Sequence, residues 1–193
     1  MTFDWSPLTW QAWGIAALIL CTLVAVESDQ RVQRIPNSLV MATLCVGLAL
    51  HTLGPVNNRD GLFDNYPGAL GLWPSLLGVL TGFLIFLPLH LVRAMGAGDV
   101  KFMSAMGAFT GPSQALVLAL CVLIAGGVMS IFVMWWRQQS RAVLGQVRHI
   151  FASWLHGQPP LFDARTQSVY RMPYALAFAL GLSGFLSLRM AAF

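Results

Sequence analysis

Residues 113–136 read SQALVLALCVLIAGGVMSIFVMWW and contain no charged side chain. A helix needs about 20 consecutive apolar residues to cross the hydrocarbon core of a bilayer, and this stretch has that length. The rest of the chain has the same character: 57% of all residues are hydrophobic and 9% are charged. Roughly a quarter of residues are charged in an ordinary soluble domain. The composition therefore predicts an all-α membrane protein.

Other apolar stretches have a similar length and predict further spans. They lie at residues 10–26, 35–53, 75–92 and 172–188. A shorter apolar stretch, residues 101–111, ends at Gly111-Pro112, a pair that breaks helices, and is predicted to be a partial or tilted span. We expect a polytopic helical bundle of about six transmembrane helices, forming one membrane domain over residues 1–193.

Basic residues predict how these spans are oriented, because Lys and Arg are enriched in short cytoplasmic loops. Arg31 and Arg34 assign the first loop to the cytoplasmic side, and the loop 54–73, with Arg59 against two acids, suits the outside. The connection 137–171 is the most basic, with Arg137, Arg141, Arg148, Arg165 and Arg171. Both termini are then expected outside the bacterial inner membrane. Residues 1–7 contain no Lys or Arg, so we expect the first apolar run to be retained as an anchor.

Apolar residues recur at helical spacing within the basic connection and predict a helix that lies on the cytoplasmic membrane surface. They are Val143, Leu144, Val147, Ile150, Phe151, Trp154 and Leu155. The basic face of this helix favours anionic lipid head groups as its partner. The positive charges follow membrane topology, so nucleic acid is not expected as a partner.

The residues that commonly bind metals show no metal-site pattern. Cys21, Cys45 and Cys121 fall in separate apolar stretches with no CxxC spacing. His149 and His156 are two turns apart in the surface helix, too far to share a metal without further ligands. We expect neither a metal nor an organic cofactor.

Glycines four residues apart predict where spans pack closely. Gly78 with Gly82, and Gly107 with Gly111, each share one helix face. Glycine as simple flexibility is an equally good explanation. The pairs do not distinguish packing within one chain from packing between chains, and we expect a monomer.

Two acids lie at the same predicted membrane boundary and are the candidates for chemistry. Asp29 follows the first predicted span, and Asp99 closes Gly96-Ala97-Gly98-Asp99 shortly after the third. Carboxylates near a bilayer are costly and need a reason to be there. Two carboxyl groups that face one water share a proton, so one activates the water while the other protonates a substrate carbonyl. Taken alone, however, Asp29 is more simply explained as a helix-end charge paired with Arg31 or Arg34.

Two motifs favour a catalytic role for Asp29 instead, because together they resemble the motifs of the prepilin peptidase family. Gly96-Ala97-Gly98-Asp99 matches the GxGD signature of these aspartic proteases and continues with Lys101, as the family often does. Asp29 stands six residues before Ile35-Pro36-Asn37, which is similar to the family's second motif. Met172-Pro173-Tyr174-Ala175, at the start of the last span, extends the resemblance.

The resemblance implies that Asp29 and Asp99 are the catalytic pair of an endopeptidase that needs no metal or cofactor. It implies as substrate a pilin or pseudopilin precursor, with a basic leader ahead of a hydrophobic helix, cut at the cytoplasmic face. Gly96 and Gly98 would let substrate backbone approach Asp99. Pro36, Asn37 and Lys101 are motif residues without an assigned catalytic role, and Lys101 either attracts Asp99 or extends to the head groups.

The chain differs from the larger relatives of this family between its first two predicted spans. Those relatives insert a cysteine-rich, zinc-binding domain after the first span and also methylate the new pilin N-terminus. The stretch 27–34 leaves no room for such a domain. The chain is therefore similar to the short form associated with tight-adherence (Flp-type) pili, and we expect cleavage without methylation.

Three alternatives stay open at this point. Glu27 lies two residues before Asp29 and competes for the role of first acid. A non-catalytic pilus-assembly protein, or a transporter that uses carboxylates for protons or ions, would also keep two acids in the membrane. A GxGD protease of another branch would share the acids and cut a different substrate.

Overall fold

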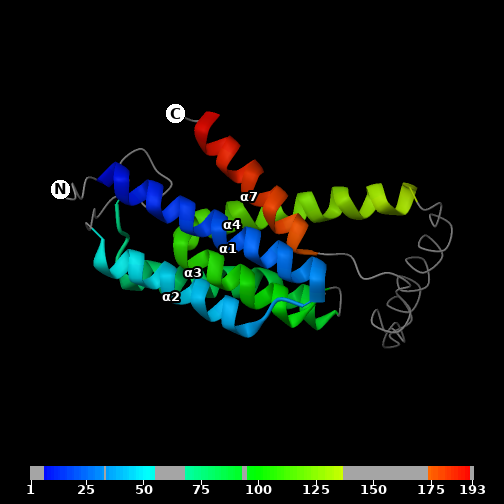
Figure 1. The fold of residues 1–193 in the computed structure, drawn as a ribbon, viewed down its shortest axis with the longest axis horizontal. Helices are drawn as coiled ribbons and strands as arrows, with labels where there is room; N and C mark the ends of the chain where they lie inside the picture. Colours follow the sequence, from blue (N-terminus) through cyan, green and yellow to red (C-terminus); the bar gives the residue numbers. More distant parts are fainter. Residues whose placement is uncertain (1–6, 33, 55–67, 93–94, 137–173, 192–193) are drawn as a thin grey trace.

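The computed structural model describes residues 7–32, 34–54, 68–92, 95–136 and 174–191, and five helices carry this part of the chain. They form an elongated bundle, with α7 inclined to the other helices (Figure 1). The helices are α1 (Pro7–Val32), α2 (Asn37–Leu53), α3 (Leu72–Leu91), α4 (Ala97–Trp136) and α7 (Tyr174–Ala191). The predicted surface helix at 143–155 lies outside the described residues.

The outer faces of the helices are apolar, as a lipid environment requires. Helices α1, α3 and α4 contain stretches long and apolar enough to cross a membrane, while α2 and α7 are shorter apolar helices. Leu20, Leu80 and Ile131 are exposed on these outer faces. Trp73 and Trp136 are exposed near helix ends, where amphipathic aromatic rings favour the head-group region. The prediction of an all-α membrane bundle is confirmed.

Helix α4 is interrupted by a reversal of the chain. Gly111 has φ 71° and ψ 175°, and Pro112 follows it without an amide proton. A straight helix would separate Asp99 from Ser130 by about 45 Å. Tyr174 instead hydrogen-bonds Ser130 while it interacts electrostatically with Asp99, so both residues lie at one end of the bundle. Figure 1 shows the two halves running in opposite directions.

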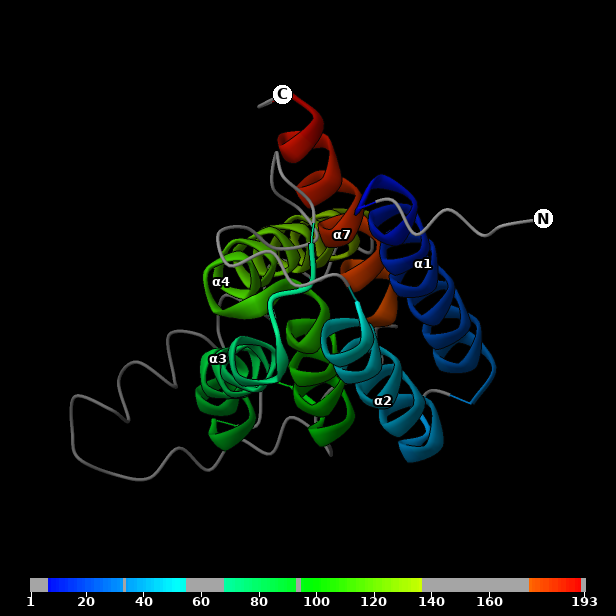
Figure 2. The same cartoon turned by 90° about the vertical axis from the view of Figure 1, so that its left-hand side faces the viewer.

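The first half of α4 is the short segment that the sequence predicts as a partial span. From Ala97 to Thr110 it measures about 20 Å, less than the roughly 30 Å hydrocarbon core. Every residue from Phe102 to Gly111 is buried. Figure 2 shows this half among the other helices. A short helix is tolerated here because protein, and not lipid, surrounds it.

The reversal leaves backbone carbonyls that buried side chains satisfy. The carbonyl of Ala108 lacks its usual helical donor, because Pro112 has none, and it accepts a hydrogen bond of 2.7 Å from Ser75 Oγ. The carbonyl of Phe109 is 2.9 Å from Nε2 of His51, which is fully buried. The amide of Leu70 donates to Nδ1 of His51 over 3.1 Å, so the proton of the neutral ring lies on Nε2. One histidine thereby ties α2, α4 and the start of α3 together.

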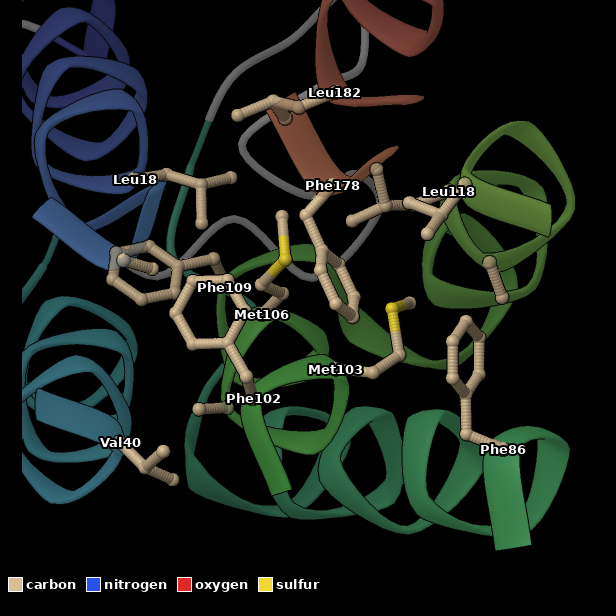
Figure 3. Close-up of a cluster of buried hydrophobic side chains, with 14 of the residues drawn as sticks. Leu18, Val40, Phe86, Phe102, Met103, Met106, Phe109, Leu118, Phe178 and Leu182 are labelled. Carbon is tan, nitrogen blue, oxygen red and sulfur yellow. The ribbon is translucent and has the colours of Figure 1, made fainter. Parts of the chain in front are cut away.

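Small residues and aromatic rings then pack the halves of the bundle. A Cβ added to Gly78 of α3 would collide with the carbonyl of Gly107 in α4, and the converse also holds. The predicted close approach at these glycines is confirmed. Phe178 of α7 stacks on Phe86 at 6.0 Å and meets Phe102 edge-on at 5.3 Å between ring centroids. Figure 3 shows this cluster. Lipid tails are as apolar as these side chains, so the hydrophobic effect does not hold the helices together, and close packing in the cluster stabilises the bundle instead.

Candidate active site

Four helix ends meet at one end of the bundle and carry the residues that the sequence singles out. The end of α1 brings Asp29, the start of α2 brings Asn37, the start of α4 brings Asp99, and the start of α7 brings Ala175. Residues far apart in the sequence therefore form one site. The opposite end of α1 is held separately, by a 3.2 Å hydrogen bond from Trp10 Nε1 to the carbonyl of Leu50.

Asp29 lies within α1 and not beyond it, since this helix continues to Val32. The helix therefore extends six residues beyond the first predicted span, which ended at residue 26. Charged residues end the apolar run in the sequence, but the backbone stays helical through them. The Asp29 side chain is buried, at 8% relative exposure, and its Oδ2 accepts the amide proton of Ala175 over 3.1 Å.

The competing acid, Glu27, is directed elsewhere. Its side chain is 61% exposed and pairs with Arg31 at 2.6 Å, one helical turn along α1. Arg31, which the sequence offered as an ion-pair partner of Asp29, thus pairs with Glu27 instead. Two acids only two residues apart face opposite environments, because successive positions on a helix point about 100° apart.

Asp99 lies in the first turn of α4. Its amide donates to the carbonyl of Gly96 over 3.2 Å, and its Oδ2 accepts the Gly96 amide proton over 3.2 Å. This reciprocal pair fixes the carboxyl group at the start of the helix. The Asp99 and Asp29 carboxylates lie close enough to interact electrostatically.

The two sequence motifs are in physical contact. A Cβ on Gly98 would lie 3.6 Å from the Cβ of Ile35, so the GxGD turn packs on the residue that opens the second motif. Pro36 precedes α2, and its carbonyl accepts the amides of the first helical turn. Lys101 Nζ donates to Asn37 Oδ1 over 3.3 Å. Lys101 thus joins the starts of α2 and α4, a contact that neither interpretation of this residue predicted.

The sequence argument missed the contribution of α7. Tyr174 is half-buried, its hydroxyl hydrogen-bonds the Ser130 side chain, and this hydroxyl lies near enough to Asp99 to be influenced by its carboxylate charge. The Ala175 amide belongs to the backbone, so the identity of the side chain does not indicate that it binds Asp29. The only available signal was the similarity of Met172-Pro173-Tyr174-Ala175 to the family.

The chemistry available is that of two carboxyl groups. In each acid a backbone amide holds Oδ2, and the described residues offer no hydrogen bond to Oδ1. One oxygen of each acid is thus oriented and the other is available to a water or a substrate. Within the same residues, no group of three or more His, Cys, Asp or Glu side chains would hold a metal ion.

The chain is similar in sequence to a known family of proteins. Residues 16–131, more than half of the chain and including both acids, match the model of the type IV leader peptidase family. A prepilin leader peptidase/N-methyltransferase of Xanthomonas campestris pv. campestris is 28% identical over 135 residues, which cover 69% of this chain and 44% of that protein. The proteins of the same name from Stutzerimonas stutzeri and Pseudomonas aeruginosa are each 30% identical, over 64% and 63% of this chain.

The chain spans less than half the length of these relatives, since the matches cover 39% and 41% of the last two. No solved structure matches the chain. The family match nonetheless covers most of α1, all of α2 and α3, and most of α4, and it includes Asp29 in α1 and Asp99 in α4. The chain therefore belongs to the type IV leader peptidase family.

Proposed function

We propose that this protein is an aspartic endopeptidase that removes the leader from type IV prepilins and pseudopilins, with Asp29 and Asp99 as its catalytic pair. The observation that carries the proposal is the meeting of these two acids, 70 residues apart in the chain, at one end of the bundle. Family membership supports the same reading, because the relatives are prepilin leader peptidases.

The proposed reaction is hydrolysis of a peptide bond by a water held between the two carboxyl groups. The ionised acid takes a proton from the water, whose oxygen attacks the scissile carbonyl carbon. The protonated acid gives its proton to the carbonyl oxygen. When the tetrahedral intermediate collapses, the C–N bond breaks and the nitrogen leaves as an amine with a proton from the acid–base pair. No step requires a metal or an organic cofactor.

The location of the site supports the substrate class that family membership suggests. Asp29 and Asp99 are near the ends of apolar helices, beside the basic residues Arg31 and Lys101, which is the end assigned to the cytoplasm by charge. A precursor with a hydrophobic helix in the bilayer and a polar leader at this surface would present the junction between them to the dyad.

The narrower assignment is to the short enzymes of tight-adherence (Flp-type) pili, which cleave without methylating. Its support is the connection between α1 and α2, which consists of residues 33–36 and holds no inserted domain. Mass spectrometry of the cleaved pilin tests this part. A free N-terminal amine is expected, and a methylated one would contradict it.

The test of the dyad is cleavage of a candidate Flp-type prepilin by the purified protein, followed by gel shift and N-terminal sequencing. Asp29→Asn and Asp99→Asn should each abolish cleavage while the proteins still insert and fold. Glu27→Gln is the matched control: it removes an exposed acid from the same helix and should cut at the wild-type rate. Cleavage by either Asp variant would refute the dyad. A wild-type protein that cuts no candidate would favour the assembly or transport alternative.

A further inference from the structure

We propose that the backbone amide of Ala175 is a positioning group of the active site, because it orients the Asp29 carboxylate for catalysis. The start of α7 would then be a third component of the site beside the two acids. This inference rests on the proposed function, since it takes Asp29 to be catalytic. It also gives a role to the 172–175 motif, which the dyad alone leaves unexplained.

Ala175 and Asp29 are in direct contact. The Ala175 amide donates to Asp29 Oδ2 over 3.1 Å, across 146 positions of the sequence. Ala175 is in the first turn of α7, where the first amides have no acceptor within their own helix. The amide is therefore free to bind a side chain, and the positive end of the helix dipole favours a carboxylate there.

The start of α7 is also fixed from another side. The Tyr174 hydroxyl hydrogen-bonds Ser130 in the second half of α4. Ala175 is fully buried, and Phe178, one turn further, is packed between Phe86 and Phe102. An amide carried on so constrained a helix holds its partner in one orientation.

The two acids are held in parallel ways. Asp99 Oδ2 accepts the Gly96 amide proton, as Asp29 Oδ2 accepts that of Ala175. The Gly96 donor is local, three residues away, whereas the Ala175 donor comes from a different helix. Two carboxyl groups that must share one water need defined orientations, and misplacement by about 1 Å can cost a hundredfold in rate.

Other groups near this end do not take the place of the amide. In the part of the chain that the structure describes, α1 packs on α7, α2 and α4. Among the polar and ionisable groups that those helices bring to this end, Tyr174 is bonded to Ser130, Lys101 is bonded to Asn37, and Asp99 accepts the Gly96 amide proton. On α1, Glu27 and Arg31 pair with each other.

The experiment compares variants that keep the Ala175 N–H with variants that lack it. Ala175→Pro removes the N–H at a helix position where proline is tolerated, and Ala175→Gly keeps it. Leu176→Pro introduces the same ring one residue later and leaves the Ala175 amide intact. We expect Ala175→Pro to lower kcat by about ten- to a hundredfold with KM within about twofold of wild type. Ala175→Gly should stay within about threefold of the wild-type kcat, and Leu176→Pro should lose far less than Ala175→Pro.

A purely structural role would give a different pattern, in which loss of activity follows loss of fold. Thermal unfolding in detergent is therefore measured for each variant. If Ala175→Pro does not fold, an ester at the 174–175 linkage, made with the α-hydroxy analogue of alanine, removes the same N–H without adding a ring. An unchanged kcat in a folded variant that lacks the N–H, or an equal loss in Leu176→Pro, would overturn the inference. The Asp→Asn variants in the same assay separate this outcome from failure of the dyad.

Discussion

The two glycines of the GxGD turn differ in what surrounds them. A Cβ on Gly96 would lie 3.1 Å from Asp99 Oδ2, closer than most Cβ atoms come to any neighbour. Among the described residues, the atoms nearest to a Cβ on Gly98 belong to Ile35, at 3.6 to 3.9 Å, which is ordinary van der Waals contact. Glycine at position 96 therefore leaves room for the Asp99 carboxyl group. At position 98 the fold shows no such crowding, and the reason we propose for glycine there is the approach of a substrate backbone.

Alanine at each glycine should therefore have different effects on cleavage. Gly96→Ala displaces the Asp99 carboxyl group and is expected to lower kcat about tenfold or more. Gly98→Ala is expected to leave the unfolding temperature unchanged and to raise KM, because the added methyl group meets the substrate and not the protein. Steady-state cleavage kinetics and thermal unfolding in detergent check both statements. A destabilised Gly98→Ala protein would contradict this expectation, because the methyl group would then be meeting the protein and not the substrate.

At the scale of single elements, the reversal in α4 depends on buried polar groups. Pro112 removes one helical donor, and Gly111 takes a left-handed φ, so the helix cannot continue. His51 and Ser75 satisfy the carbonyls of Phe109 and Ala108. These side chains stabilise a turn that would be costly in hydrocarbon without them.

Replacement of His51 should reveal this dependence. His51→Leu leaves the Phe109 carbonyl and the Leu70 amide without partners in a buried site, and should cost about 2–4 kcal/mol of stability. His90→Leu is the control: the His90 ring makes one hydrogen bond, to the carbonyl of Met95, in a half-buried position, and its loss should cost less. Unfolding by SDS in mixed micelles measures both. Equal losses would contradict the assignment of His51 as the support of the turn.

The contact between α3 and α4 offers a second test of an element. Gly78→Ala or Gly107→Ala inserts a methyl group against the backbone of the facing helix and should cost about 1–3 kcal/mol. Gly127→Ala and Gly184→Ala are matched controls, because a Cβ at either position meets nothing within 4 Å. Their stability should equal or slightly exceed that of wild type, since alanine favours helix. If Gly78→Ala left the free energy of unfolding unchanged, the two helices would be able to move apart without a loss of stability.

At the scale of the whole molecule, the orientation in the membrane stays a prediction. Cysteine accessibility tests it in a background that lacks Cys21, Cys45 and Cys121. Arg31→Cys, near the end of α1, should react with a membrane-impermeant maleimide only in inverted vesicles. Thr52→Cys is exposed at the opposite end of α2 and should react only from the outside. The reverse pattern would place the dyad on the other side of the membrane.

Much of the bundle could be predicted from the sequence, because hydropathy and glycine spacing reflect physical needs of spanning helices. The acids and the two motifs were also identifiable, as they rest on side-chain identity. The extent of α1 was not, since its last turns carry the charges Glu27, Asp29 and Arg31. Neither was the Ala175 amide, because every residue but proline has one and only the fold decides where it points.

The hydrogen bond between Asp29 and Ala175 joins the first helix to the last one described, and this has a consequence for biosynthesis. The ribosome delivers both acids to the membrane well before residue 175 emerges. On the arrangement proposed above, the growing chain would hold its dyad without the group that orients it. The peptidase would then work well below its full rate during its own insertion and would reach that rate only when α7 docks.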